Sequence, residues 1–145
     1  MESHSLYNFV ISAGKTYEGT SEFSCVGTEC TVSFEDGTIF TGRDDDGVVK
    51  FTDIPYAEPP VGDLRWKAPI IRDDFNGESL DCTEEGAACG ITNEDCLFIN
   101  LYVARSVMET DQKVPVLFNI HGGGLQGGDN SIHDVNNLVL EQGTG

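Results

Sequence analysis

The sequence has few basic residues and no long hydrophobic run. Its 145 residues include 8 Lys and Arg against 25 Asp and Glu, which gives a formal net charge of −17 at pH 7. Such a charge repels phosphate backbones, so the composition argues against a nucleic-acid partner and favours solubility. No stretch approaches the roughly 18 consecutive apolar residues of a membrane helix. We therefore expect no nucleic-acid partner and no membrane span.

The cysteines include no C-x-x-C pair and no cluster with His at zinc spacing, so we predict no metal and no cofactor. Five of them stand at positions 25, 30, 82, 89 and 96. Cysteines in an acidic chain suit an oxidising compartment, and their odd number leaves at least one without a partner in this chain. No signal peptide is visible, because the first residues lack a positive region and a sufficient apolar run. An N-terminus further upstream would reconcile the two observations.

Alternating apolar and polar residues predict a small antiparallel β-meander over residues 31–52. Its three strands are expected at Thr31–Phe34, Thr38–Thr41 and Val48–Phe51, with turns at Glu35–Gly37 and Arg43–Gly47 between them. Residues 1–24 are polar and weakly patterned. We therefore leave 1–24 unassigned and treat 25–145 as one domain portion.

The next stretch, Ile54–Pro69, contains four prolines in 16 residues. Proline has a fixed φ and no backbone N–H, so this stretch is predicted to be a rigid extended loop, neither a helix nor a central strand. It carries Tyr56 and Trp66, which we expect to pack against a core. Residues 70–95 are polar and contain glycine, and they are predicted to be loop.

Two further strands are predicted in the second half of the chain. Cys96–Val103 is rich in β-forming residues, and Val114–Ile120 is nearly all apolar, which is typical of a strand buried on both faces. Asp134–Gln142 is predicted to form a short helix, with Asp134 near its N-cap and Gly143 at its end.

A glycine-rich loop, beginning at His121-Gly122-Gly123-Gly124, follows the predicted buried strand directly. Open α/β sheets place their chemistry at the carboxyl end of such strands. Glycines there let backbone N–H groups turn toward developing negative charge, such as the oxyanion of an acyl-transfer reaction. In that interpretation His121 supports the loop through hydrogen bonds.

The same loop allows two other interpretations when it is taken alone. Gly122-x-Gly124-x-x-Gly127 fits the dinucleotide fingerprint G-x-G-x-x-G, and a plain turn is the third alternative. The dinucleotide interpretation requires a helix that begins inside the motif and an acidic residue about 20 positions later, at or beyond the end of this chain.

Three segments carry the most specific motifs of the sequence: Asp53–Trp66, Glu94–Tyr102 and Pro115–Gly124. Together they resemble one family, the type-B carboxylesterases, which include the cholinesterases. Asp53–Trp66 (DIPYAEPPVGDLRW) resembles its F-x-G-I-P-Y-A-x-P-P-V-G-x-L-R-F stretch. Glu94–Tyr102 (EDCLFINLY) resembles E-D-C-L-x-L-N-V-Y, and Pro115–Gly124 (PVLFNIHGGG) resembles the strand and oxyanion loop. The three motifs occur in the family's order and spacing, so the resemblance covers roughly residues 31–145.

The resemblance implies an α/β fold, here the N-terminal part of an α/β-hydrolase in which a small meander precedes the first strands of the main mixed sheet. It implies a carboxylic ester hydrolase that acts on small-molecule esters through Ser-His-acid catalysis, in a secreted or secretory-lumen setting. It assigns four site features: oxyanion N–H donors at Gly123 and Gly124, loop support at His121, a Cys89–Cys96 disulfide, and a buried salt bridge between Arg65 and Glu94. Two positions depart from the family: Asp53 stands where Gly is usual, and Leu125 replaces an aromatic residue of the acyl pocket.

The catalytic serine is absent, because no G-x-S-x-G occurs in the sequence. We therefore expect an N-terminal fragment of a serine esterase, truncated before the nucleophile and inactive alone. One alternative is a non-catalytic interaction module that pairs through a sheet edge. Another is a dinucleotide-binding half-domain at Gly122–Gly127. The sequence does not define the acyl group, the alcohol group or the oligomeric state.

Overall fold

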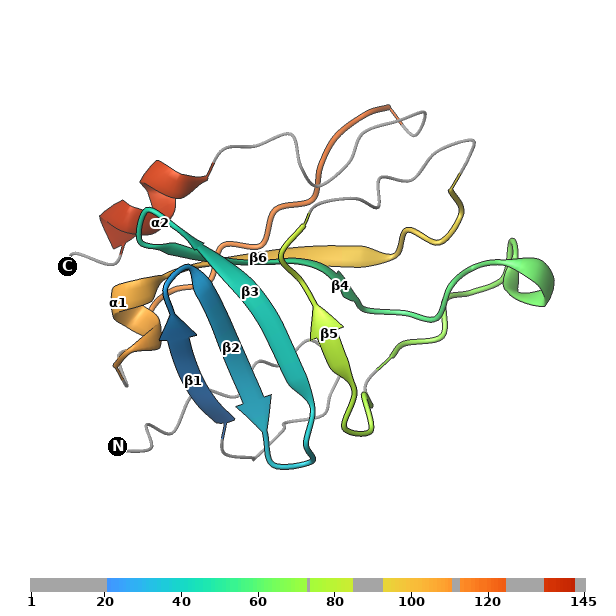
Figure 1. Cartoon of the computed structure of the whole chain (residues 1–145). Coiled ribbons are helices and arrows are strands. Elements are labelled where there is room, and N and C mark those ends of the chain that lie inside the picture. Colours follow the sequence, from blue (N-terminus) through green and yellow to red (C-terminus); the bar gives the residue numbers. More distant parts are fainter. Residues whose placement is uncertain (1–20, 73, 85–92, 111–112, 125–134, 143–145) are drawn as a thin grey trace.

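One twisted sheet forms the body of the molecule (Figure 1). The computed structural model describes residues 21–72, 74–84, 93–110, 113–124 and 135–142. The strands are β1 (Ser21–Val26), β2 (Glu29–Phe34), β3 (Ile39–Asp45), β4 (Val48–Pro55), β5 (Ser79–Asp81) and β6 (Phe98–Ala104). The helical elements are the 3-10 turn η1 (Gly62–Leu64), α1 (Arg105–Met108) and α2 (Asn136–Gln142).

Consecutive antiparallel pairings run from β1 to β4, and they confirm the predicted meander. The strand order is β1-β2-β3-β4-β6, and β5 pairs with β3 in parallel. Gly37 and Gly47 have φ values of 88° and 92° in the two inner turns, a conformation that glycine adopts without steric cost. The carboxylate of Asp44 accepts the Gly47 N–H at 2.8 Å and closes the β3–β4 turn. The turn residues and the alternation of apolar and polar residues along the strands therefore determine this part of the fold.

Strand β6 was also predicted, and it pairs antiparallel with β4 across an irregularity between Phe51 and Ile54. Asp53 lies in that irregularity with φ at 55°, and its N–H donates to the side-chain oxygen of Asn100 at 2.9 Å. This left-handed conformation explains why the resembling family prefers glycine at this position. β4 continues to Pro55, two residues into the proline-rich stretch. Proline is tolerated there because β3 pairs with β4 only at Val48–Lys50.

The strained position gives a direct stability test. We expect Asp53→Gly to be more stable than Asp53→Ala by about 1 kcal/mol, because alanine keeps the steric cost of a positive φ and glycine does not. Both variants lose the same carboxylate, so each is the control for the other. Urea denaturation of the two variants measures the difference. Equal stabilities would show that residue 53 is unstrained.

A cluster of buried apolar side chains is centred on Phe51 of β4. Its buried members are Cys30, Val49, Phe51, Ile54, Cys82 and Met108. Gly42 is required beneath Phe51, because a Cβ built there would lie 2.6 Å from the Phe51 ring and 2.4 Å from the Lys50 carbonyl oxygen. Phe51 and the glycine facing it therefore define how β3 and β4 pack.

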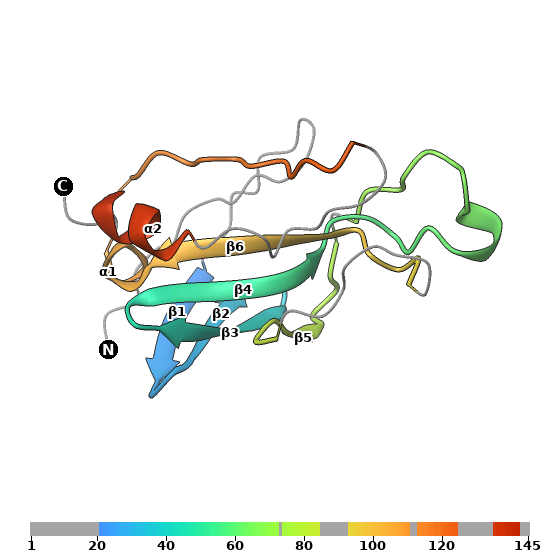
Figure 2. The ribbon, with the colours of Figure 1, turned by 90° about the horizontal axis from the view of Figure 1, so that it is seen from above.

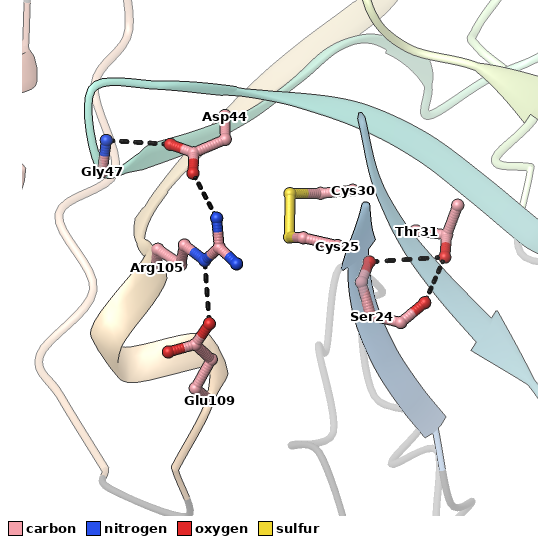
Figure 3. Close-up of a disulfide and its surroundings, with 8 residues drawn as sticks. All are labelled: Ser24, Cys25, Cys30, Thr31, Asp44, Gly47, Arg105 and Glu109. Carbon is pink, nitrogen blue, oxygen red and sulfur yellow. Dashed lines mark hydrogen bonds and ion pairs between the residues drawn. A yellow bond between two sulfur atoms is a disulfide. The ribbon is translucent and has the colours of Figure 1, made fainter. Parts of the chain in front are cut away.

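Cys25 and Cys30 form a disulfide between directly opposite residues of β1 and β2 (Figure 3). Next to it, the Ser24 and Thr31 hydroxyl groups form a cross-strand hydrogen bond of 2.9 Å. Strand β1 was not predicted, because its polar sequence gives no alternating signal. The disulfide and the register of β1 against β2 define this edge of the sheet.

A charged cluster ties the β3–β4 turn to α1 (Figure 3). Arg105 donates to Asp44 and to Glu109, each at 2.8 Å. The same Asp44 carboxylate closes the turn at Gly47, so one side chain serves both connections. This cluster fixes the point where β6 leaves the sheet.

The prediction of a buried strand at Val114–Ile120 is wrong for the structure observed. Residues 113–120 are extended but belong to no strand, and Figure 2 shows them running on the side of β6 away from β4. Val116, Leu117, Phe118 and Ile120 are 68–79% exposed. A strand forms only where a neighbour accepts its hydrogen bonds, and no strand in the described ranges pairs with this segment.

The expected packing of Tyr56 and Trp66 is also wrong. Tyr56 is 39% exposed and Trp66 is 90% exposed. The loop that contains η1 reaches out beyond the sheet (Figures 1 and 2), and Trp66 follows η1 in the sequence. Trp66 has φ at 62°, and the Arg65 guanidinium lies 5.4 Å from its ring centre. The predicted helix near the C-terminus forms at Asn136–Gln142, while positions 134 and 143 lie outside the described residues.

Candidate functional site

The glycine loop is an exposed extension of the unpaired apolar segment. His121, Gly122, Gly123 and Gly124 are all exposed. Gly123 and Gly124 have φ values of 144° and 61°, and residues other than glycine rarely adopt either value. A Cβ at Gly122 or Gly124 would meet no atom within 4 Å. The glycine at 124 is therefore required by backbone conformation and not by crowding.

The predicted donors in this loop are the backbone N–H groups of Gly123 and Gly124. Within the described part of the chain, neither donates to a backbone carbonyl. The Nδ1–H of His121 donates to the Gly122 carbonyl oxygen at 2.9 Å and bends the loop locally. Backbone donors at a turn of glycines can stabilise an oxyanion, provided that the surrounding structure holds them in place.

Arg65 and Glu94 form an ion pair of 2.5 Å between the proline-rich loop and the segment before β6. Their side chains are 52% and 42% exposed, so the pair is not the buried salt bridge implied by the resemblance. Solvent screens an exposed pair, which is worth at most about 1 kcal/mol. The pair joins two of the three motif segments, and its role as a family feature stays a prediction.

The predicted Cys89–Cys96 disulfide falls partly outside the described residues. Cys96 is disulfide-bonded, while Cys89 lies in a range that the structure does not describe. Cys82 is a free thiol, 1% exposed in the core. Its burial, together with the nearby carboxylates of Asp81 and Asp53, raises the pKa of the thiol to about 11. The unpaired thiol that the odd cysteine count allowed is therefore an unreactive core residue.

We expect Cys82 to resist alkylation at pH 8 until the chain unfolds. With a pKa raised from 9.0 to about 11, its thiolate fraction falls about 100-fold, and burial blocks access further. This group also makes the fold less stable as the pH rises from 9 toward 11, since the folded state disfavours the thiolate. Mass spectrometry after iodoacetamide treatment measures the rate at which Cys82 is alkylated in the folded chain in water and in the unfolded chain in urea. Equal labelling rates in water and in urea would contradict the burial.

The described residues offer little support for a dinucleotide or metal site. No helix begins between residues 113 and 124, although a fingerprint glycine loop requires one, and Gly127 lies outside the described residues. No group of three or more His, Cys, Asp or Glu side chains in the described ranges could hold a metal ion. In those same ranges, no helix has the length and apolar character needed to cross a membrane.

Comparison with known proteins identifies the family. The sequence profile of the Carboxylesterase family matches residues 30–144. The chain belongs to the carboxylesterase family. It is 36% identical over 106 residues to a juvenile hormone esterase of Tribolium castaneum, covering 66% of this chain and 18% of that protein. It is also 36% identical over 116 residues to the pyrethroid hydrolase Ces2a of Mus musculus, covering 66% and 20%.

Solved esterases share the fold of this chain. EstA of Aspergillus niger superposes with a TM-score of 0.61 at 32% identity, over 71% of this chain and 22% of that protein. A thermophilic PNB esterase superposes with a TM-score of 0.56 at 32% identity, over 66% and 22%. The predicted family and the N-terminal α/β-hydrolase fold are confirmed. The chain spans about a fifth of the length of the relatives it matches.

Proposed function

We propose that this chain supplies the oxyanion loop of a serine carboxylic ester hydrolase. The observation that carries the proposal is the glycine loop at His121–Gly124, which follows an apolar extended segment in a carboxylesterase-family chain. Gly123 and Gly124 provide the backbone N–H donors, and His121 shapes the loop. The serine, the histidine and the acid come from polypeptide beyond these 145 residues, since no G-x-S-x-G occurs here.

The chemistry assigned to the loop is electrostatic. When a serine attacks an ester, the carbonyl oxygen gains negative charge, and two fixed N–H donors stabilise it without any proton transfer. Each lost donor costs about 3–4 kcal/mol of transition-state stabilisation. The loop therefore contributes to the rate only together with a nucleophile, and the 145-residue chain alone is expected to be inactive.

The substrate class is a small-molecule carboxylic ester, and the setting is the secretory pathway. Family membership supports the first assignment. The Cys25–Cys30 disulfide supports the second, because structural disulfides persist in oxidising compartments.

A chimera tests this function. Residues 21–124 of this chain replace the corresponding part of the thermophilic PNB esterase, which keeps its own nucleophile and acid–histidine pair. Hydrolysis of a short-chain nitrophenyl ester is the readout, and the isolated 145-residue chain is the negative control. We expect the chimera to hydrolyse this ester. A folded chimera without activity would show that this loop is not a working oxyanion loop.

A further inference from the structure

The turn before β5 contains the pair Asn76-Gly77, which occurs nowhere else in the sequence. Both residues have left-handed backbone conformations, with φ at 48° and 78°. The Glu78 N–H donates to the Phe75 carbonyl oxygen at 2.8 Å and closes the turn. A turn with two left-handed positions favours Asn and Gly, so the same residues that form this turn also place an asparagine directly before a glycine.

The two residues of this pair are accessible to water. Asn76 and Gly77 are both exposed, and no group in the described ranges forms a hydrogen bond with the Asn76 side-chain amide. The Gly77 N–H donates to the Thr38 hydroxyl oxygen at 3.2 Å, at the long end of the usual range. Opening of this single turn therefore releases both reacting groups, and exposed turns are among the parts of a fold that open most readily.

An Asn-Gly pair can modify itself through its own backbone. The Gly77 nitrogen loses its proton to a hydroxide ion and attacks the Cγ carbon of Asn76, since glycine has no Cβ to hinder the approach. An N–Cγ bond forms, the Cγ–Nδ2 bond breaks, and Nδ2 takes a proton from water and leaves as ammonia. Water then opens the succinimide ring at either carbonyl group, which gives aspartate or isoaspartate. The conversion consumes one water molecule and releases one ammonia molecule.

Two Asp-Gly pairs in other turns, Asp36-Gly37 and Asp46-Gly47, lack this reactivity. A carboxylate repels an incoming anionic nitrogen and has no ammonia to release. The Asp36 oxygens also accept hydrogen bonds from the Thr38 N–H and hydroxyl group, at 2.8 and 3.0 Å. Asn76 is therefore the site in these turns at which self-modification should occur first.

We infer that Asn76-Gly77 is a self-modification site, and that isoaspartate formed there loosens β5 from β3. In isoaspartate the backbone runs through the former side chain, which adds a methylene group to the turn. The turn has no room for it, because a Cβ on Gly77 would already lie 3.1 Å from the Asp36 carbonyl oxygen in the neighbouring β2–β3 turn (Figure 1). The Ile39 N–H donates to the Glu78 carbonyl oxygen at 2.9 Å, so a displaced turn disturbs the first link between β3 and β5.

The buried thiol of Cys82 reports this loosening, because it directly follows β5 and is 1% exposed. Its N–H donates to the Thr41 carbonyl oxygen of β3 at 2.7 Å. If β5 separates from β3, reagents reach the thiol. This chemistry needs no catalytic serine, so it is independent of the proposed esterase activity.

Incubation of the folded 145-residue chain in mildly alkaline buffer, followed by peptide mapping with fragmentation mass spectrometry, tests the site. We expect Asn76 to lose its amide and isoaspartate to appear at this position. Asn137 is the internal control, since it is also exposed but precedes Leu138, whose side chain hinders the attack. An unmodified Asn76 in the folded chain contradicts the inference, whether or not the chain reacts in urea. Equal loss of amide at Asn76 and Asn137 also contradicts it.

Iodoacetamide labelling of the incubated chain tests the effect on β5. Cys82 in the isoaspartate form should be alkylated roughly 5–30-fold faster than in the fresh chain, the change that one destabilising event produces in an opening equilibrium. Asn76→Asp is the matched control, because it adds the same charge without lengthening the backbone. Its Cys82 should be labelled within about two-fold of the fresh chain's rate. Unchanged labelling of the isoaspartate form would show that the turn does not hold β5.

Discussion

Gly124→Ala in the chimeric esterase should lower kcat by roughly 10²–10³-fold, the effect of losing one oxyanion donor. The space around Gly124 is open, so the added methyl group causes no clash. The effect comes from φ, which is 61° at this position and is unfavourable for alanine. The loop then relaxes to a more common conformation and turns its N–H away from the developing charge.

Gly122→Ala is the matched control. A Cβ at Gly122 also meets open space, but this residue is not among those with a positive φ. Its replacement should leave kcat within about two-fold of the chimera's value. Initial rates at saturating ester give kcat for both variants. If Gly122→Ala and Gly124→Ala lose activity equally, or neither does, the left-handed glycine is not the element that aims the donor.

The largest effect on stability is expected from Phe51→Ala, at about 3–5 kcal/mol. Phe51 is 2% exposed and lies over Gly42 in the centre of the core. Its removal leaves a cavity that the facing strands cannot fill, because β3 and β4 are held by their register. A domain is usually stable by only about 5–15 kcal/mol, so this variant should be largely unfolded at 37 °C.

Urea denaturation followed by circular dichroism measures the loss, with Val26→Ala as the control. Val26 is 82% exposed, and its truncation should change the free energy of unfolding by less than about 0.5 kcal/mol. A Phe51→Ala variant with unchanged stability would mean that the core is not centred on this ring.

The meander and β6 could be predicted because their signals are local. Alternation sets the inward faces of the strands, and the turns before Gly37 and Gly47 have the residues that left-handed positions require. Strand β5 could not be predicted in this way. It is three residues long, and its pairing with β3 brings together residues about 40 positions apart. No local pattern encodes such a partner.

The failure at Val114–Ile120 has a different cause. The composition is that of a strand buried on both faces, but burial depends on neighbours and not on composition. The prediction that Trp66 packs against a core was wrong for the same reason. The Arg65–Glu94 pair shows this too, since the partners meet but remain exposed. The sequence motifs identified the family correctly, while the role of the glycine loop stays a prediction.

The cysteines mark another limit of the sequence. The sequence assigned no partner to Cys25 or Cys30. Because β1 gave no strand signal, the sequence did not show that the two residues lie opposite each other in a hairpin. Asp53 was noted only as a departure from the family. The structure supplies its reason, a left-handed residue whose N–H is held by Asn100.

The central claim is that these residues work as part of a serine esterase. The most direct measurement is capture of the native product with an antibody against residues 53–69, followed by labelling with a fluorophosphonate that reacts with activated serines. We expect one labelled band roughly three to four times heavier than the 15.7 kDa of this chain, because the matched 66% of this chain makes up 18–20% of the relatives. An unlabelled band near 15.7 kDa, with no heavier product, would contradict the claim and leave the chain as a binding module built on an esterase fold.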